Sequence, residues 1–415
     1  MMSNALAKWQ GISLILRIII GMIIGIAFAL SVPGNTVLPI FGKVFVGLLK
    51  GIAPILVFVL VISALANASG NIGGRFKNVI MIYIFGTFFA SVTAVLACQL
   101  FPVTMKLTDA ATDAAPDGIG QILTTIITNV VANPVNALMN GNYLSILCWA
   151  IIFGLGFKKL ASKGTCDMVA DLAAVVSKAV FWIIQLAPFG IMGLVFSAVS
   201  ENGLEIFVDY GRLLVVLVGC MFAMALIVNP LITFFFLRRN PYPLVWKCLK
   251  ISGVTAFFTR SSAANIPVNM KACEEWGMDK DTYSVTIPLG ATINMDGAAI
   301  TITIMTLAAA NTLGIQVSLP AAIVLSAMSA LGACGASGVA GGSLLLIPMA
   351  CSLFGISNDV AMQMVGVGFI IGVVQDSVET ALNSAGDVEF AATAEYHQWR
   401  KQGKSLPEFL TGKKN

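Results

Sequence analysis

Three carboxylates and two neutral polar side chains share one face of an apolar segment near the end of the chain. They are Asp376, Glu379, Thr380, Asn383 and Asp387, and the twelve residues before them, MVGVGFIIGVVQ, carry no charge. On an α-helix these positions fall within roughly a 100° arc and rise about 16 Å, about half of a hydrocarbon core of roughly 30 Å. A buried Asp or Glu near the bilayer centre costs at least ~2.5 kcal/mol. The row therefore predicts a binding site for ions or a polar substrate.

The composition predicts an all-α membrane protein. Hydrophobic residues make up 58% of the 415 residues and charged residues 11%, and the mean hydropathy is +0.90, which excludes an ordinary soluble domain. The eight cysteines form no C-x-x-C pair, no phosphate-binding loop with its lysine occurs, and the net charge is only +4. These features disfavour a thiolate metal site, ATP-driven pumping and nucleic-acid binding. The single histidine, His397, lies in the polar tail, where we expect it to be solvated.

Eight apolar segments are long enough to span a bilayer at about 20 residues each. They cover residues 12–32, 37–65, 79–101, 121–157, 172–199, 211–237, 282–311 and 359–394. Lys and Arg gather in alternate loops and Asp and Glu in the loops between them, which predicts that both termini are cytoplasmic. In the first segment Gly21 and Gly25 match G-x-x-x-G, a weak indication of close helix contact.

Two further apolar segments, 244–273 and 319–355, must both span or both turn back, because otherwise the basic tail would lie outside. Each is broken at its centre, the first by Arg260 and Pro267 and the second by a glycine-rich run over 332–343. Such breaks suit a hairpin tip that is buried in protein. We therefore expect two re-entrant hairpins of opposite orientation, each followed by a helix with polar interruptions, as in inverted-repeat transporters.

The polar residues at these breaks have both a structural and a binding explanation. Ser261 and Ser262 could simply bond to the preceding helical turn, but beside Arg260 the free N–H groups of a broken helix end favour an anionic group. The turn 294–297, NMDG, could bend its helix, or it could offer bare carbonyls and one carboxylate to a small cation. The glycine-rich run could be a close-packing surface or a movable gate.

Four motifs in this order resemble the dicarboxylate/amino acid:cation symporter family. They are TRSS at 259–262, GATINMDG at 290–297, GASGVAGG at 335–342 and the polar helix at 376–387. The resemblance implies eight transmembrane helices with two opposed re-entrant hairpins, a homotrimer in the bacterial inner membrane, and an elevator motion that carries substrate and sodium. It implies a transporter and not an enzyme, with sodium as the coupling ion and no organic cofactor.

The resemblance also implies an order of domains. Scaffold helices 1 and 2 would occupy residues 1–75, and helix 3 with an outer loop would occupy 76–120. Helices 4 to 6, mainly scaffold, would follow in 121–240. The remaining elements would be the first hairpin (241–281), the seventh helix (282–312), the second hairpin (313–358), the eighth helix (359–396) and a cytoplasmic tail (397–415).

Roles for single residues follow from the same resemblance. Asp376 would receive a substrate ammonium group, and Asn383 with the Ser261–Ser262 tip would hold the substrate carboxylate. The rest of the implied substrate site is Thr380, Val339, Arg260 and Glu379. The three implied sodium sites are Asp387 with Gly290, Asn294 and Asn383; carbonyls near Thr292 and Ala336; and Asp296 with Asn294, Tyr83 and Thr87. Gly86 and Ala298 stand where the family's acidic-amino-acid members have threonines.

Glu379 is the main departure, because it stands where acidic-amino-acid carriers of the family place an arginine. At an effective dielectric of 20, a like-charge contact near 4 Å costs on the order of 4 kcal/mol, so Glu379 would repel an acidic side chain. A carboxylate can accept a hydroxyl hydrogen bond, whose loss costs about 1 to 3 kcal/mol. We therefore expect a small neutral hydroxyl amino acid, serine or threonine, as substrate.

Three alternatives remain open at this stage. An acidic amino acid or dicarboxylate could be the substrate if Glu379 were protonated or paired with Arg260. A passive channel would carry the substrate without concentrating it. An intramembrane serine hydrolase could use Ser261 or Ser262, although no histidine or lysine is evident as its base.

Overall fold

A computed structural model describes residues 12–67, 74–107, 132–336 and 341–411, and no strand occurs among them. Seven of its helices are long and apolar enough to cross a membrane, or eight if one bent pair is a single span. The protein is therefore an integral, multi-pass membrane protein, as the composition predicts. The expected fourth span began at 121, but residues 121–131 lie outside the described part, and the spanning helix there is Tyr143–Leu160.

The first half of the chain supplies a group of helices that pack on one another. The group consists of α2 (Leu14–Ser31), α3 (Leu38–Ala66), α7 (Tyr143–Leu160), α8 (Lys163–Ile184) and α9 (Ala187–Asn202), with the short α6 (Pro134–Asn140) beside α7. The α8–α9 pair bends by 54°. The expected contact of Gly21 and Gly25 is confirmed, because a Cβ there would lie 2.2 Å from the Pro188 carbonyl oxygen and 2.5 Å from that of Met192. Only glycine lets α2 and α9 cross this closely.

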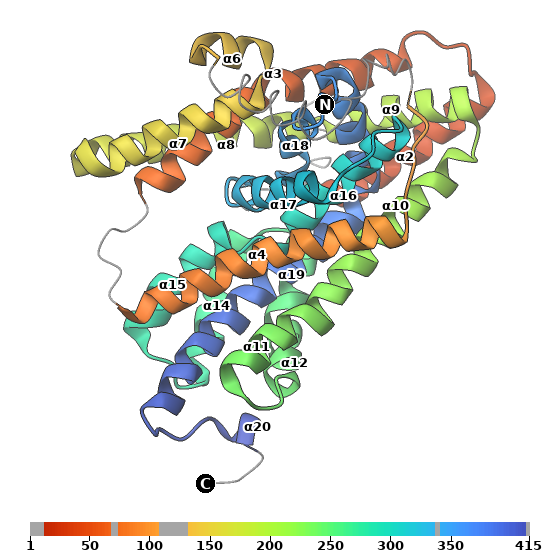
Figure 1. The fold of residues 1–415 in the computed structure, drawn as a ribbon. Coiled ribbons are helices and arrows are strands. Elements are labelled where there is room, and N and C mark those ends of the chain that lie inside the picture. Colours follow the sequence, from red (N-terminus) through yellow and green to blue (C-terminus); the bar gives the residue numbers. More distant parts are fainter. Residues whose placement is uncertain (1–11, 68–73, 108–131, 337–340, 412–415) are drawn as a thin grey trace, which may run out of the picture.

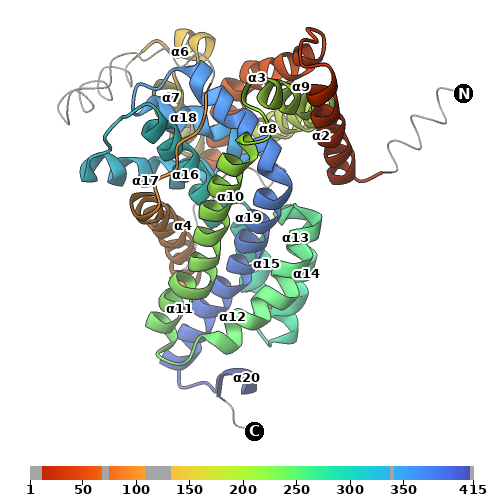
Figure 2. The same cartoon turned by 90° about the vertical axis from the view of Figure 1, so that its right-hand side faces the viewer.

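A second group surrounds one long helix, α19 (Asn358–Lys401), which runs through the middle of Figures 1 and 2. Its neighbours include α4 (Gly74–Leu100) and the continuous rod of α10 (Ile206–Ala223), η1 (Met224–Val228) and α11 (Asn229–Leu237). Most of the polar face from 376 to 389 is buried on this helix. The long span therefore holds the predicted polar row inside protein and away from lipid.

Three pairs of shorter helices pack on this group. The first is broken at Arg260, as the sequence predicts, but the expected break at Pro267 is wrong, because Pro267 lies inside the continuous helix Ser262–Glu275. The first pair joins α12 (Tyr242–Cys248), η2 (Leu249–Gly253) and α13 (Val254–Thr259) to α14 (Ser262–Glu275). The second is α15 (Lys280–Ile293) and α16 (Asp296–Thr312), interrupted at Asn294 and Met295. The third joins α17 (Leu319–Ala333) to η3 (Ser343–Leu346) and α18 (Ile347–Ser352), and residues 337–340 at its centre lie outside the described part.

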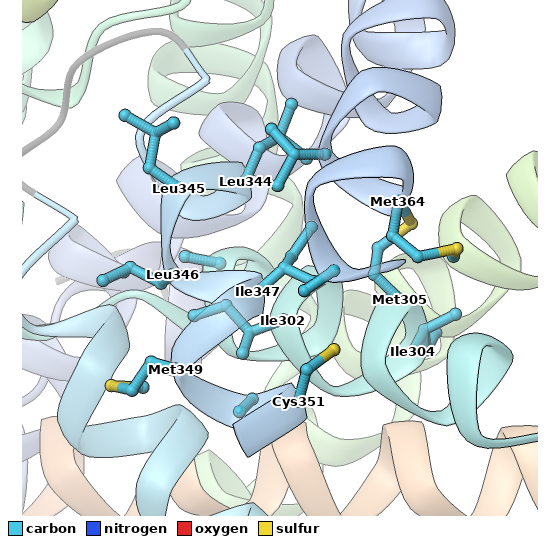
Figure 3. Packing of buried hydrophobic residues seen from close by; sticks show 14 of the residues in the cluster. Ile302, Ile304, Met305, Leu344, Leu345, Leu346, Ile347, Met349, Cys351 and Met364 are labelled. Carbon is cyan, nitrogen blue, oxygen red and sulfur yellow. The ribbon is translucent and has the colours of Figure 1, made fainter. Parts of the chain in front are cut away.

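Apolar packing fixes the third pair against α16 and α19. Figure 3 shows Leu344, Ile347 and Met349 of η3 and α18 lying among Ile302 of α16 and Met364 of α19, and all of these side chains are fully buried or nearly so. This core places the start of η3, at Ser343, beside the polar face of α19.

The expectation for His397 is wrong, because α19 continues through the predicted tail as far as Lys401. The His397 ring nitrogen Nδ1 lies 2.8 Å from the carbonyl oxygen of Phe236, and Arg400 Nη1 donates to the Leu237 carbonyl at 2.8 Å. Both groups satisfy carbonyls that the end of α11 leaves without helical partners. Farther on, α20 (Glu408–Thr411) folds back, and the ring of Phe409 lies 5.7 Å from that of Trp276.

Candidate functional site

The carboxylate of Asp376 joins α19 to the first and third broken helix pairs. Arg260 Nε and Nη2 each lie 2.6 Å from Asp376 Oδ2, and the Gly341 backbone N–H donates to Oδ1 at 3.2 Å. Arg260 ends α13 with a left-handed φ of 52°, a conformation that is uncommon for a residue other than glycine. Arg260 therefore lies at the tip where α13 turns into α14, and its pair with Asp376 joins this tip to α19.

Glu379 is held by neutral donors, one turn away on the same face. Its Oε2 accepts hydrogen bonds from Gln375 Nε2 at 2.5 Å, Thr301 Oγ1 at 2.7 Å and Ser343 Oγ at 2.9 Å. The side chain is only 5% exposed. The acidic-substrate alternative allowed Glu379 to be protonated or paired with Arg260. The pairing is wrong, because the guanidinium lies on Asp376.

Asp387 and Asn294 are hydrogen-bonded to each other, and each also has a buried side-chain oxygen. Asn294 Nδ2 donates to Asp387 Oδ1 at 3.1 Å and to the Asn383 carbonyl at 3.2 Å. Asp387 Oδ2 and Asn294 Oδ1 are both buried, and neither has a hydrogen-bond partner in the part of the chain that the structure describes. A Cβ on Gly290 would lie 2.9 Å from Asp387 Oδ1, so the glycine leaves room there. Buried oxygens without donors suit a small hard cation.

The residues of the third predicted cation site lie together but are largely occupied by one another. Thr87 Oγ1 lies 3.3 Å from Asp296 Oδ1 and accepts from the Met295 N–H at 3.2 Å, and Tyr83 donates to the Asp387 carbonyl at 2.9 Å. Asp296 Oδ2 accepts from Asn229 Nδ2 at 3.1 Å. Here the acidic residue already has two donors.

Gly86 and Ala298 adjoin this third group, at the positions where the sequence departs from acidic-amino-acid carriers. A Cβ at Gly86 would lie 2.6 Å from Phe390 Cε2. A threonine there would require Phe390 to move. Ala298 is fully buried.

The remaining predicted substrate residues use their side chains within the protein. Ser261 Oγ caps α14 by accepting from Ala264 N at 3.2 Å, and Thr380 Oγ1 donates to the Asp376 carbonyl at 2.7 Å. Asn383 Oδ1 accepts from Gly297 N at 2.7 Å. Ser262 is 2% exposed.

Among the described residues, no hydrogen bond joins Thr292 to Ala336, the two residues that mark the second predicted cation site. Thr292 is exposed and donates to the Leu289 carbonyl at 2.7 Å, while Ala336 is buried. Cys334 Sγ lies 3.5 Å from the Ile293 carbonyl oxygen, which brings the end of α17 to the break between α15 and α16. Val339 lies outside the described residues.

A polar network fixes α14 to α19 beside the site. Asn265 Nδ2 lies 2.8 Å from Ser384 Oγ and 3.0 Å from Ser252 Oγ, and Asn269 Nδ2 donates to the Ser384 carbonyl at 3.2 Å. All four side chains are buried. The first broken pair is therefore joined to α19 by buried hydrogen bonds as well as by the Arg260–Asp376 pair.

A cavity lies beside the charged pair, on the side that faces the first group of helices. Arg260, Asp376 and Gly341 line it together with Ile18 of α2 and Ile184 of α8. The charged end of the site thus meets an apolar surface of the other helix group.

A family model described as the sodium:dicarboxylate symporter family matches residues 14–396. The chain belongs to this family. The match covers every element that carries the polar site. The protein is accordingly a transporter and not an enzyme, and the cap that Ser261 forms on α14 is a structural role for one of the two serines that the hydrolase alternative required.

Curated members of the symporter family resemble the chain over nearly its whole length. A protein of Bifidobacterium adolescentis is 63% identical over 407 residues, which are 98% of this chain and 95% of that protein. A protein of Streptococcus agalactiae is 57% identical over 95% of this chain and 98% of its own length. A protein of Streptococcus thermophilus is 53% identical over 96% of this chain and 100% of its own length. Each of the three is named serine/threonine transporter SstT.

Sequence reasoning on this symporter missed the three donors to Glu379. Gln375 stands four residues before Glu379, which places the two on one helical face, so its spacing could have indicated the contact. Thr301 and Ser343 come from α16 and η3. Their approach depends on how the broken helices pack, which no local pattern in the sequence reveals.

Proposed function

We propose that the protein takes up serine and threonine by sodium-coupled secondary active transport. Glu379 carries this proposal, because a buried carboxylate held by three neutral donors stands where a positive charge would be needed to bind an acidic side chain. The names of the relatives support the same substrates.

The substrate ammonium group would bind at Asp376. Both contacts between Arg260 and Asp376 go to Oδ2, and among the described residues Oδ1 accepts one backbone N–H, at 3.2 Å. Oδ1 therefore has capacity for another donor. The cavity beside the pair adjoins this carboxylate. The substrate carboxylate would lie toward Asn383 and the Ser261–Ser262 tip, with Thr380, Arg260 and Val339 completing the site.

The hydroxyl of serine or threonine would donate to Glu379. An aspartate or glutamate side chain would instead place a second negative charge beside it, at a cost on the order of 4 kcal/mol for a contact near 4 Å at a dielectric of 20. The charge of Glu379 thus favours a donor and disfavours an acceptor. This comparison argues against the acidic-substrate alternative.

Sodium would bind most readily at Asp387. Asp387 Oδ2 and Asn294 Oδ1 are buried acceptors without donors, and the carbonyls of Gly290 and Asn383 lie on the elements beside them. The other two proposed sites are the carbonyls near Thr292 and Ala336, and Asp296 with Asn294, Tyr83 and Thr87. A cation at Asp387 would neutralise a buried carboxylate that forms no ion pair with any described residue.

The first and third broken pairs, 241–281 and 313–358, would be re-entrant hairpins. In an elevator motion, the group around α19 would move across the membrane relative to the group of α2, α3 and α7–α9. The presence of two separately packed groups supports this division. A homotrimer in a bacterial inner membrane, with both termini cytoplasmic, completes the proposal.

Uptake into proteoliposomes tests this function. An inward sodium gradient should concentrate labelled serine, and unlabelled threonine should compete, whereas aspartate and succinate should not. Accumulation driven by a proton gradient without sodium would reject sodium coupling. Flux that never exceeds the external serine concentration would support a passive channel.

A further inference from the structure

The three donors to Glu379 all meet the same oxygen. Gln375 Nε2, Thr301 Oγ1 and Ser343 Oγ lie 2.5, 2.7 and 2.9 Å from Oε2. Among the described residues none donates to Oε1. The two oxygens of one carboxylate therefore have different surroundings, one occupied by the protein and one left for another donor.

Gln375 and Thr301 also bond to each other, which makes the arrangement around Oε2 stiff. Gln375 Nε2 donates to Thr301 Oγ1 at 2.7 Å, and Thr301 Oγ1 lies 3.0 Å from the Gly297 carbonyl oxygen on its own helix. Both side chains are fully buried. The one-turn spacing of Gln375 and Glu379 on α19 holds the amide beside the carboxylate.

The backbone also limits where Glu379 can move. A Cβ on Gly297 would lie 2.8 Å from Glu379 Cα and 2.9 Å from its Cγ. The stem of Glu379 therefore packs against the first turn of α16, and the donors fix its end. Because both the stem and the carboxylate of Glu379 are held in place, its second oxygen, Oε1, has a fixed direction.

We propose that Gln375 and Thr301 are positioning residues for substrate specificity, because they occupy Glu379 Oε2 and leave Oε1 as a single acceptor for the substrate hydroxyl. A fixed carboxylate with one available oxygen presents the substrate hydroxyl with one acceptor atom in a fixed position. Without Gln375 or Thr301, Glu379 would rotate and lose its preference for a hydroxylated side chain. This inference rests on the proposed function.

Ser343 adds the end of the glycine-rich run, residues 341–343, to the same arrangement. Its hydroxyl comes from the start of η3, two residues after Gly341, whose N–H donates to Asp376. The same segment therefore contacts both the carboxylate for the ammonium group and the carboxylate for the hydroxyl. The position of this segment therefore depends on its hydrogen bonds to both Asp376 and Glu379.

The ratio of inhibition constants for alanine and serine tests the proposal, because alanine is serine without the hydroxyl. The ratio is measured by competition with sodium-driven uptake of labelled serine, and it does not depend on the amount of active protein. Thr301→Val and Gln375→Met should each reduce the ratio by roughly tenfold, as expected when a hydrogen bond to a charged group is lost. Thr301→Ser keeps the hydroxyl and should restore the wild-type ratio.

A matched control and a second background show whether these residues act through Glu379. Thr303→Val removes an equally buried hydroxyl of α16, which bonds to Ser91 at 2.5 Å, and should leave the ratio unchanged. In a Glu379→Gln background, Thr301→Val should change the ratio less than about twofold, because coupled residues are not additive.

The failures of the two proposals can be told apart. Wild-type protein without sodium-driven serine uptake would overturn the proposed function. Wild-type uptake with an unchanged alanine-to-serine ratio in Thr301→Val and Gln375→Met would overturn the positioning role alone. An equal reduction by Thr303→Val would also overturn it.

Discussion

Arg260 Nε and Nη2 both lie 2.6 Å from a single oxygen, Oδ2, of Asp376. Arg260 belongs to the turn between α13 and α14, and Asp376 stands on α19, 116 residues later. The guanidinium thus occupies the carboxylate that is proposed to bind the substrate ammonium group. A cationic substrate group must share Asp376 with Arg260 or displace it from Oδ2.

The charge of Asp376 should be essential for substrate binding. We expect Asp376→Asn to raise the serine concentration for half-maximal uptake at least about a hundredfold, because removing one partner of a buried ion pair costs about 3 to 5 kcal/mol. Asp359→Asn is the control, since Asp359 is an exposed carboxylate on the same helix that pairs with Lys50. Uptake by Asp376→Asn with a wild-type half-maximal concentration would remove Asp376 from the site.

Arg260 should stabilise the protein most when no substrate is bound. Arg260→Gln leaves Asp376 without its cation, so the melting temperature of the sodium-free, serine-free protein should fall by about 3 to 6 °C, the shift that a loss of about 3 to 5 kcal/mol produces in a chain of this length. Sodium with saturating serine should then raise the melting temperature more in the variant than in the wild type, because the ammonium group supplies the missing charge. Equal increases in both proteins would mean that the ammonium group binds elsewhere.

Sodium affinity should depend on Asp387 and on the absence of a side chain at Gly290. Asp387→Asn should raise the sodium concentration for half-maximal serine uptake by roughly tenfold or more, since about 1.4 kcal/mol corresponds to a factor of ten. Gly290→Ala should act in the same direction, because its Cβ would lie 2.9 Å from both Asp387 Oδ1 and Tyr83 Oη. Gly219→Ala should leave sodium dependence unchanged, because a Cβ there would have no described atom within 4 Å apart from the nearby backbone of its own helix.

The C-terminal turn should contribute to stability and not to specificity. Phe409 packs between the rings of Trp276 and Tyr396, with Lys247 Nζ 4.6 Å from its centroid. Phe409→Ala should lower the free energy of unfolding by about 1 to 2 kcal/mol, less than the ~3 to 5 kcal/mol of a fully buried phenylalanine. Hydrogen exchange should become faster over 402–411 while the half-maximal serine concentration stays the same.

Phe258→Ala is the control for that change, because Phe258 is 74% exposed. A larger loss of stability from Phe258→Ala than from Phe409→Ala would contradict the role of the C-terminal turn.

The sequence predicts the spans and their breaks because these follow from local chemistry. Apolar runs of membrane length, and glycine, proline and charge at Arg260 and in 294–297, are visible without knowledge of the fold. The helical period alone places Asp376, Glu379 and Asp387 on one face. The family resemblance then gives their roles, and the close approach of Asp387 to Asn294 agrees with one of them.

Partners from distant segments could not be predicted in the same way. Thr301 and Ser343 reach Glu379 only because α16 and η3 pack on α19, and each lies far from Glu379 in the sequence. His397 looked solvated because it follows the last apolar segment, but α19 continues and its end meets the free carbonyls of α11. The partner of a helix end depends on which other element packs beside it, and the local sequence does not specify that packing.

The claim that Glu379 selects the substrate side chain is tested by substrate competition in the Glu379→Arg variant. In the wild type, serine should inhibit sodium-driven uptake at a concentration at least about a hundredfold below that of aspartate, as expected for like-charge repulsion on the order of 4 kcal/mol. In Glu379→Arg the affinity for serine should fall and that for aspartate should rise, so that their order reverses. Unchanged serine uptake in Glu379→Arg, or equal inhibition by serine and aspartate in the wild type, would contradict the claim.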